Sequence, residues 1–366
     1  MAFSSTHGRF RAHLNSAGTP ITTTGSVRMN SRHDADATAF LMNTIMGFWL
    51  GPTLWVAVRL KLPDRLRQSP ARAESLAEEL SANRDYLRRI LNALASVGVF
   101  HRDEEDRFTN TSISEMLCQD HPSGIAQLVD TSLGGQNYPA WALLEEAVKR
   151  GECAFDIAHG VNWIEYLDQH PERREIFATA MTATTRATEK AVLNAHDFGQ
   201  FELAVDIGGS HASLIGRLLE RYPSARGIVF DLPDTVAAGR IHWQSASFAD
   251  RLEAVGGDFF KAVPTGDLYL LKLILHDWQD DDAIAILKTI RKAIPSHGRV
   301  AIIETVLPDD ASGHLGWGLD IAMMVTTGGK ERSLSEHSRL LSTAGFEVIR
   351  CAPTPSMYSV VEARPV

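Results

Sequence analysis

The sequence predicts an α/β protein in two parts: a mainly α-helical N-terminal region with a winged-helix unit, and a C-terminal doubly wound α/β domain. Three observations support this prediction. The chain has 366 residues, which suits two domains of about 150 residues better than one. Apolar residues recur at three- and four-residue spacing up to residue 198. After residue 200, short apolar runs alternate with helical stretches instead.

Composition limits the function classes. Hydrophobic residues make up 44% of the chain and charged residues 22%, which is typical of a soluble globular protein. The 36 Lys and Arg against 45 Asp and Glu leave a net charge of −9, so a nucleic-acid backbone would be repelled unless the basic residues cluster. The three cysteines lack metal-ligand spacing, and we expect neither a disulfide framework nor a metal site.

The N-terminal segment raises the question of targeting. Residues 1–33 hold four Arg, no acidic residue and no apolar block long enough for a secretory signal. We interpret them as a disordered tail, with a transit peptide as the alternative. Residues 37–58 carry no charge and are long enough to cross a bilayer. Because Asn43, Gly47 and Pro52 interrupt this stretch, we favour two helices buried at a subunit interface, which predicts a homodimer without a membrane partner.

The winged-helix pattern lies inside the helical region, which we assign to residues 34–198. Leu76 and Leu80 share one helix face, and Asn83 is placed to cap a second helix. An acidic hairpin tip at residues 103–106 follows and resembles the wing of a winged-helix unit.

A winged helix suggests DNA binding, and charge tests that suggestion. Residues 71–110 contain six Arg against eight acidic residues, and the wing tip is negative where a phosphate contact needs a cation. Arg84, Arg88 and Arg89 are the residues that keep the alternative open. We therefore expect a dimerisation scaffold that binds no nucleic acid, with a ligand-sensing regulator as the rival.

The α/β domain is assigned to residues 199–366. Its apolar runs predict seven strands, namely Leu203–Ile207, Gly227–Phe230, Leu252–Val255, Leu268–Leu273, Val300–Ile303, Phe346–Arg350 and Tyr358–Ala363. Helical spacing between them predicts Ala212–Arg221, Asp281–Ala293 and Ser335–Thr343. Ligands of such a sheet lie outside the carboxyl ends of its strands. The residues just after each apolar run are therefore the candidates for function.

Those residues disfavour a dinucleotide. Asp231 lies 23 positions after Gly208, as a ribose-binding acid would, but the fingerprint Gly-x-Gly-x-x-Gly has Ser210 and Ser213 in its second and third glycine positions. A pyrophosphate needs close backbone approach there, whereas a ligand with a ribose and no phosphate needs less. S-adenosylmethionine fits that description.

Several motifs in order resemble a known family. They are Asp206-Ile-Gly-Gly, Phe230-Asp-Leu-Pro, Gly257-Asp-Phe-Phe, Leu271-Lys-Leu-Ile-Leu-His-Asp-Trp and Gly329-Lys-Glu-Arg-Ser. Together they are similar to the caffeate/hydroxyindole-type small-molecule O-methyltransferases, and most similar to the bacterial natural-product branch. The resemblance covers residues 34–366. It implies a Rossmann-like S-adenosylmethionine-dependent domain preceded by a winged-helix dimerisation domain.

The resemblance also implies how the cofactor is bound. Asp206, Gly208 and Gly209 would frame its methionine end. Asp231 would accept hydrogen bonds from the ribose hydroxyls.

The adenine end and the glycine turn complete that expectation. Asp258 would bind the adenine amino group, Phe259 would pack on the ring, and Lys272 would line the pocket. Ser210 and Ala212 stand where the family more often has Gly, and a positive φ at Ser210 would carry strain.

His276 is the candidate general base. A phenol has a pKa near 10 and is a poor nucleophile until its proton is removed. An unperturbed imidazole, with a pKa of about 6.5, is largely neutral at cytoplasmic pH and accepts that proton. Glu304 ends the next strand in sequence, so we expect its carboxylate to reach the ring and orient it. Glu331 resembles the family's second carboxylate, and Asp277 is interpreted as a structural neighbour.

The sequence thus predicts a cytoplasmic homodimeric enzyme that methylates a hydroxyl of an aromatic small molecule without a metal. Met181 and Met324 match positions near the family's substrate cavity. Two alternatives remain within the fold: methylation of nitrogen or carbon, and cofactor-dependent hydroxylation or decarboxylation. The acceptor itself is not determined by the sequence.

Overall fold

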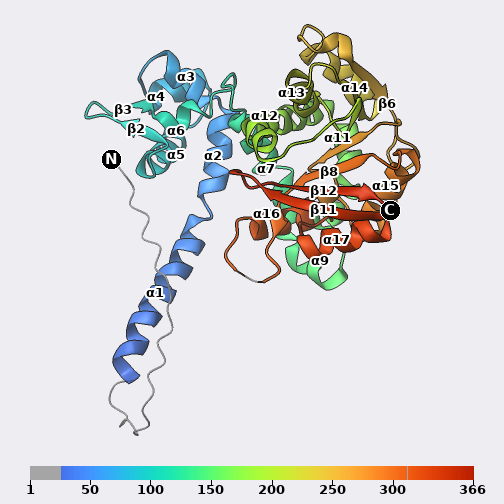
Figure 1. The fold of residues 1–366 in the computed structure, drawn as a ribbon. Coiled ribbons are helices and arrows are strands. Elements are labelled where there is room, and N and C mark those ends of the chain that lie inside the picture. Colours follow the sequence, from blue (N-terminus) through green and yellow to red (C-terminus); the bar gives the residue numbers. More distant parts are fainter. Residues whose placement is uncertain (1–25, 311) are drawn as a thin grey trace. The chain divides into compact units, whose positions relative to one another are not determined.

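The computed structural model describes residues 26–310 and 312–366, with side chains from residue 34 onward (Figure 1). Two compact units divide the chain at residues 50 and 51. In the first unit, α1 (Ser26–Gly47) begins inside the segment predicted as a tail, and the remainder of that segment, residues 1–25, lies outside the described part.

The uncharged N-terminal stretch forms two helices, as predicted. Helix α1 ends at Gly47, and α2 (Leu50–Arg59) follows with Pro52 in its first turn, where a missing N–H costs no helical hydrogen bond. Judged by length and composition alone, residues 34–59 could cross a membrane. Of the 18-residue stretch that meets this criterion, 11% is buried. In α1 the exposed apolar side chains include Phe40 at 69% and Ile45 at 65%. Burial of this surface at a subunit interface stays a prediction at this point.

The winged-helix unit follows. Strands β1 (Ala71–Arg72), β2 (Phe100–Arg102) and β3 (Arg107–Asn110) form an antiparallel sheet in the order β1-β3-β2. Helices α4 (Ala73–Glu79) and α5 (Arg84–Ser96) form the helix-turn-helix, and Asn83 caps α5 by accepting the N–H groups of Asp85 and Tyr86.

The arginines of α5 that favoured DNA binding have partners within the chain. Arg88 forms an ion pair with Glu74, and the Arg89 guanidinium lies 5.7 Å from the centre of the Tyr86 ring. Two of the three arginines that the DNA-binding hypothesis needs are therefore engaged in contacts within the chain.

Helix α3 (Leu62–Gln68) precedes this unit, and further helices connect the unit to the α/β domain. They are α6 (Ser112–Glu115), α7 (Ile125–Ser132), α8 (Asn137–Ala142), α9 (Leu144–Arg150), α10 (Ala154–His159), α11 (Trp163–Gln169) and the long α12 (Pro171–Ala195). Helix α12 supplies Val192 and Leu193 to the core beneath the large sheet.

Seven strands form that sheet, in the order β11-β12-β8-β7-β4-β5-β6. The five from β8 to β6 run parallel, whereas β12 and β11 are antiparallel. Their bounds are β4 (Leu203–Ile207), β5 (Arg226–Asp231), β6 (Leu252–Gly256), β7 (Leu268–Lys272), β8 (Arg299–Glu304), β11 (Phe346–Pro353) and β12 (Ser359–Pro365). Each strand predicted from an apolar run is present, with bounds shifted by up to three residues.

Helices cover both faces of this sheet (Figure 1). Alternate strand residues pack against α13 (Ser213–Arg221) on one face and against α15 (Asp280–Ala293) and α17 (Leu334–Thr343) on the other. Burial on both faces explains why the strands are nearly continuous apolar runs. The smaller elements here are α14 (Pro233–Gly239), η1 (Arg240–His242), η2 (Ala249–Arg251), η3 (Leu275–Asp277) and α16 (Gly316–Thr326).

A short parallel pair brings distant segments together. Strand β9 (Val306–Leu307), just after β8, pairs with β10 (Arg332–Ser333). Strands β7 and β8 also pair, with Lys272 opposite Ile303. The segments that follow β7, β8 and α16 therefore meet at the carboxyl edge of the sheet.

Candidate active site

His276 lies in η3, the single turn that follows β7, and is 6% exposed. Its Nδ1 atom lies 2.7 Å from Oε1 of Glu331. An ionised carboxylate only accepts hydrogen bonds, so Nδ1 carries the hydrogen and donates it. When the ring is neutral, the lone pair lies on Nε2, which is then the base position of the ring. Glu331 holds the imidazole in one tautomer, as a third group that orients a base does.

The charge around the ring changes its basicity. Burial by itself lowers the pKa of His276, but the carboxylates of Asp277, Glu331 and Glu304 together outweigh it and raise the pKa to about 9. The Asp277 carboxylate lies 3.7 Å from Nε2. The sequence predicts an unperturbed imidazole that is largely neutral at cytoplasmic pH, but three nearby carboxylates raise the pKa of this ring well above 6.5 and favour its charged form. Asp277 is therefore an electrostatic partner of the ring as well as its chain neighbour.

Glu304 is arranged differently from the expectation. It was predicted to orient the imidazole ring, but its Oε1 accepts the backbone N–H groups of Ile274, Leu275 and His276 at 3.2, 2.7 and 3.2 Å. The turn after β7 points three successive N–H groups at the end of β8, and such a concave set of donors binds a carboxylate oxygen. Glu304 thus holds the backbone under His276, while Glu331 holds the ring.

The second Glu304 oxygen, Oε2, is buried without a hydrogen-bond partner in the described part of the chain. His337 Nε2 lies 3.9 Å from it, beyond hydrogen-bond distance. Burial raises the pKa of Glu304, and the like charge of Glu331 raises it further, against the lowering effects of His276 and Arg332. Glu304, Glu331, Arg332 and the candidate base His276 therefore form one electrostatic unit.

Arg332 is a residue that the sequence analysis did not single out. Its side chain is fully buried, and its guanidinium donates to the carbonyls of Leu275 at 2.8 Å and Trp278 at 2.7 Å. It also donates to Asp280 at 3.0 Å. The turn that carries His276 is therefore held from both directions, with its N–H groups on Glu304 and its carbonyls on Arg332. The position of Arg332 beside Glu331 in the Gly-Lys-Glu-Arg-Ser motif was the available signal.

The expected ribose-binding carboxylate lies at the end of β5. Asp231 Oδ2 accepts the Ser210 N–H at 2.9 Å, and Oδ1 accepts the Leu232 N–H at 2.7 Å. Each carboxylate oxygen has a further lone pair, so both remain able to accept a ribose hydroxyl. Burial raises the pKa of Asp231.

The turn after β4 is tightly packed at its glycines. A Cβ added to Gly208 would lie 2.3 Å from Ile274 Cδ1, and one added to Gly209 would lie 2.8 Å from the Asp206 carboxyl. Gly208 has a φ of +68°. A side chain at Gly208 would push the Ile274 side chain aside, and one at Gly209 would push the Asp206 carboxyl aside, so both positions favour glycine.

The same turn is strained where the sequence departs from the family pattern. Ser210 has a φ of 46° and Ala212 a φ of 57°, so both adopt the left-handed conformation that L residues disfavour. Leu273, three residues before His276, has a φ of 57° as well. Strained residues of this kind concentrate at functional sites, where the surrounding structure holds them in place.

Asp206 and Lys272 are a carboxyl and an amine that interact electrostatically and would carry opposite charges when both are ionised. Burial raises the pKa of Asp206 to about 7, and burial lowers the pKa of Lys272 to about 8 even though the Asp206 carboxylate acts in the opposite direction. The Lys272 ammonium lies 4.9 Å from the centre of the Tyr358 ring. Tyr358 precedes β12 and was absent from the predicted site; an aromatic face stabilises a buried cation.

The expected adenine-binding residues lie after β6. Asp258 accepts the N–H of Phe260 at 2.9 Å and pairs with Lys261 at 3.0 Å. The contact with Lys261 lowers the pKa of Asp258. The Phe259 ring meets the Trp278 ring edge-on at 6.0 Å, which connects this corner to the segment after His276.

The two methionines expected at the acceptor cavity lie on different helices, α12 for Met181 and α16 for Met324. Asp320, one turn before Met324, accepts the Glu331 N–H at 2.9 Å. Residues four apart share a helix face, so Met324 is on the side of α16 that faces Glu331. Met181 precedes Thr182, whose hydroxyl lies 3.0 Å from His211 in the turn after β4.

Comparison with known proteins matches the chain to two described domains. Residues 141–347 match the O-methyltransferase domain, and residues 42–120 match the O-methyltransferase dimerisation domain. The phenazine O-methyltransferase PhzM of Lysobacter antibioticus is 37% identical over 90% of this chain and 96% of its own length. The mitomycin biosynthesis 6-O-methyltransferase of Streptomyces lavendulae is 35% identical over 84% of this chain and 89% of its length.

Solved O-methyltransferase structures are similar to this chain over most of its length. The LaPhzM structure superposes with a TM-score of 0.86 at 37% identity and covers 90% of this chain and 99% of that one. The neocarzinostatin O-methyltransferase NcsB1, solved with S-adenosylmethionine and 2-hydroxy-5-methyl naphthoic acid, superposes with a TM-score of 0.77 at 29% identity, over 87% of this chain and 96% of that one.

The predicted fold class is therefore confirmed, and the match to the dimerisation domain supports a homodimer. The motifs, the seven-stranded sheet and the two family matches lead to one conclusion: this chain belongs to the S-adenosylmethionine-dependent O-methyltransferases that carry an N-terminal dimerisation domain, the family of the bacterial natural-product enzymes.

Proposed function

We propose that this enzyme methylates a phenolic hydroxyl of an aromatic secondary metabolite, with Nε2 of His276 as general base. The observation that carries the proposal is the 2.7 Å contact between His276 Nδ1 and Glu331 Oε1, made at the carboxyl edge of the sheet. This contact leaves the opposite ring nitrogen free for an acceptor. Glu304 and Arg332 act as positioning residues, because they bind the backbone of the same turn.

The cofactor would be held by residues that fit it. The unused lone pairs of Asp231 suit ribose hydroxyls, the close-packed Gly208 and Gly209 leave backbone open to the methionine end, and Phe259 offers a ring face for adenine. S-adenosylmethionine supplies an electrophilic methyl on a sulfonium. Asp206 and Lys272 line the same pocket, and Asp258 is assigned to the adenine amino group.

The raised pKa of His276 gives the base its strength. Transfer of a phenolic proton from a pKa near 10 to an unperturbed imidazole of pKa 6.5 would cost about 5 kcal/mol. With the ring at about 9, that cost falls to about 1.4 kcal/mol. The resulting imidazolium is stabilised by Glu331 and Asp277. The proton then leaves to solvent when the product departs.

The acceptor class is inferred from the relatives and from the two methionines expected at the acceptor. The relatives are named as a phenazine O-methyltransferase, a mitomycin biosynthesis 6-O-methyltransferase and a 2,7-dihydroxy-5-methyl-1-naphthoate 7-O-methyltransferase. Met181 and Met324 would contact the flat face of an aromatic acceptor ring, because the thioether adapts to irregular aromatic surfaces.

We place the exposed apolar side chains of α1 at the homodimer interface, since the dimerisation domain begins within that helix. We assign the enzyme to the cytoplasm.

The decisive experiment compares His276→Ala with His297→Ala, since the His297 side chain is 74% exposed. We expect His276→Ala to lose about 10²–10⁴ in kcat on a hydroxylated phenazine or naphthoate while S-adenosylhomocysteine binds with unchanged affinity. His297→Ala should behave as wild type. Full turnover by His276→Ala would reject the base.

The outcome also separates the alternative acceptors. A nitrogen acceptor is named for one relative, the 8-amino-8-demethylriboflavin N,N-dimethyltransferase, at 31% identity. An arylamine substrate that is turned over equally well by His276→Ala and wild type would favour N-methylation, because a neutral amine needs no proton removed before attack.

A further inference from the structure

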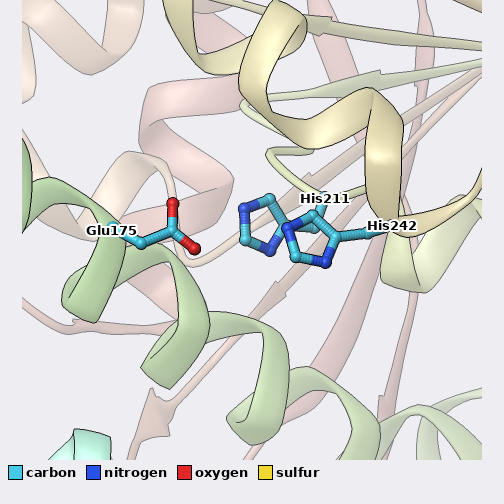
Figure 2. Close-up of side chains that lie close together, drawn as sticks. All are labelled: Glu175, His211 and His242. Atoms are coloured by element: carbon cyan, nitrogen blue, oxygen red, sulfur yellow. The ribbon is translucent and has the colours of Figure 1, made fainter.

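Three side chains outside the catalytic turn converge on one point. Glu175 comes from α12, His211 from the turn after β4, and His242 from η1, as Figure 2 shows. Their potential ligand atoms all lie within 4.8 Å of one another. Glu175 and His242 are exposed, whereas His211 is 6% exposed. The assignment of methyl transfer uses none of the three.

His211 is oriented as a metal ligand is. The Thr182 hydroxyl lies 3.0 Å from its Nδ1 atom. When the hydroxyl accepts the Nδ1 hydrogen, the other ring nitrogen, Nε2, keeps its lone pair and can bind a metal. Burial and the neighbouring His242 lower the pKa of His211 to about 4, so the ring is neutral at physiological pH.

His242 lies beside His211. The two imidazole rings lie 3.9 Å apart between centres, with 22° between their planes. Stacked imidazoles give each other no hydrogen bond, and the attraction of the Glu175 carboxylate for a proton on His211 is smaller than the effect of burial. Two imidazoles and one carboxylate therefore lie close enough together to bind one cation.

We propose that Glu175, His211 and His242 bind one divalent transition-metal ion of the zinc type, with water as the fourth ligand. In a tetrahedral site with ligand distances of about 2.1 Å, two ligand atoms are about 3.4 Å apart. The ligand atoms here lie within 4.8 Å of one another, so a pair at that limit has to close by about 1.4 Å, a movement that the exposed Glu175 and His242 side chains allow. Two imidazoles and a carboxylate suit zinc, cobalt, nickel or copper and disfavour magnesium and calcium.

Such an ion would connect three elements of the cofactor half. His211 lies between Ser210 and Ala212, both held in the left-handed conformation, and Ser210 N–H binds Asp231. A ligand bond to His211 would tether that strained turn to α12 and η1. The site therefore has a stabilising or regulatory role, and the methyl-transfer step at His276 proceeds without it.

The test measures metal binding directly on the full-length, untagged homodimer. Zinc affinity is determined by competition with a chromophoric chelator, for wild type, His242→Ala and the matched control His297→Ala, which removes an exposed imidazole elsewhere. We expect one zinc per chain in wild type and in His297→Ala. His242→Ala should lose about 100-fold or more in affinity, and Thr182→Val about 10–100-fold as an outer partner of a ligand.

Cobalt identifies the ligand atoms. Nitrogen and oxygen ligands give visible d–d bands without the near-ultraviolet charge-transfer band of a thiolate, which excludes ligation by Cys118, Cys153 or Cys351. Zinc should also raise the Tm of wild type and leave that of His242→Ala unchanged. Equal affinities in wild type and His242→Ala, no saturation at one equivalent, or a thiolate band would each overturn the proposal. Circular dichroism and S-adenosylhomocysteine binding confirm that each variant is folded, independently of turnover.

Discussion

His276 and Glu331 are 55 positions apart, yet Nδ1 of one lies 2.7 Å from Oε1 of the other, and both side chains are buried. A buried carboxylate in direct contact with an imidazole favours the protonated ring. The enzyme thereby has a base that is stronger than free histidine but is charged at neutral pH until it loses its proton.

The first prediction concerns this pair. Glu331→Gln keeps the hydrogen-bond partner and removes the charge, so the pKa of His276 falls from about 9 toward its ordinary value. In wild type, kcat/KM rises with pH up to about 9, because only the neutral ring accepts a proton. In Glu331→Gln that rise should shift down by about one pH unit or more, with a lower plateau, since the product imidazolium is less stable.

The measurement is kcat/KM from pH 6 to pH 10 with a fixed phenolic acceptor. Glu145→Gln is the control, because its carboxylate is 82% exposed on α9. A Glu331→Gln profile that coincides with wild type would show that this carboxylate does not set the basicity of the ring.

The second prediction tests Arg332 as a positioning residue. Arg332→Lys keeps the charge but cannot donate to the carbonyls of both Leu275 and Trp278. One buried acceptor left unpaired costs about 1–3 kcal/mol, and the turn that carries His276 loosens. We expect a lower Tm, a kcat reduced by more than tenfold and a KM close to wild type.

Arg339→Lys is the matched control. Arg339 lies in α17, the helix that follows Arg332, and its side chain is 73% exposed. The split between kcat and KM separates positioning from simple destabilisation, provided that the assay is run well below the lower Tm. A variant that loses stability but retains wild-type kcat would refute the positioning role.

The third prediction concerns the strained turn after β4. Ser210→Gly relieves a φ of 46° at the residue whose N–H binds Asp231. Left-handed backbone costs an L residue about 1–2 kcal/mol, and the added entropy of glycine in the unfolded chain offsets part of the gain. The variant should be about 0.5–1 kcal/mol more stable.

Urea unfolding measures this change, and Ser213→Gly serves as the opposite control. Ser213 is the first residue of α13, where glycine should destabilise. The prediction fails if Ser210→Gly is less stable than wild type. Calorimetry with S-adenosylhomocysteine on the same variant shows whether the strain contributes to cofactor affinity.

The fourth prediction concerns acid stability. His337 is fully buried, its ring nitrogens have no hydrogen-bond partner in the described part of the chain, and burial lowers its pKa to about 4. Arg332 lowers it further, whereas Glu336 acts in the opposite direction. Between pH 6.5 and about 4 the unfolded chain holds a proton that the folded chain does not. Stability is therefore lost as the pH falls through this window.

The difference between pKa values of 6.5 and about 4 corresponds to about 3 kcal/mol at the acid end. His337→Gln removes the titrating group, so its unfolding free energy should fall less steeply from pH 6.5 to pH 4 than that of wild type. Equal slopes for the two proteins would contradict the assignment. His297→Gln, at an exposed ring, should retain the wild-type slope.

The fifth prediction concerns the dimer. Ile45→Glu introduces a charge among the exposed apolar side chains of α1, where Ile45 is 65% exposed. If this surface is buried in the homodimer, an unpaired charge there should dissociate it. Light scattering after size exclusion should give the monomer mass of about 40 kDa for Ile45→Glu.

Val148→Glu on α9 is the control. Val148 is 67% exposed, and it lies outside residues 42–120, which match the dimerisation domain. It should remain a dimer. A dimeric Ile45→Glu protein would move the interface to another surface.

Many features of this protein depend on residues that are close together in the chain, so they could be predicted from the sequence. Strands such as Leu203–Ile207 are runs of apolar residues buried on both faces, and the Asn83 cap depends on N–H groups two and three residues away. The order of the motifs identified the family, and their places at strand ends put the functional residues on one edge.

Other features depend on which distant segments meet. Glu304 was expected at the imidazole because its strand neighbours that of His276, but the side chain turns to the backbone N–H groups, and the ring partner is Glu331 after α16. Pairing of β9 with β10 decides this, together with Arg332, and two-residue strands leave no pattern in sequence.

The sequence alone determined the fold class, the family and the identity of the candidate base, because side-chain periodicity and motif order are properties of the chain itself. Only the tertiary structure decided which carboxylate faces the ring, the pKa near 9 and the meeting of Glu175, His211 and His242. Basicity and ligation depend on burial and on distances between groups far apart in the chain, which exist only once the chain has folded.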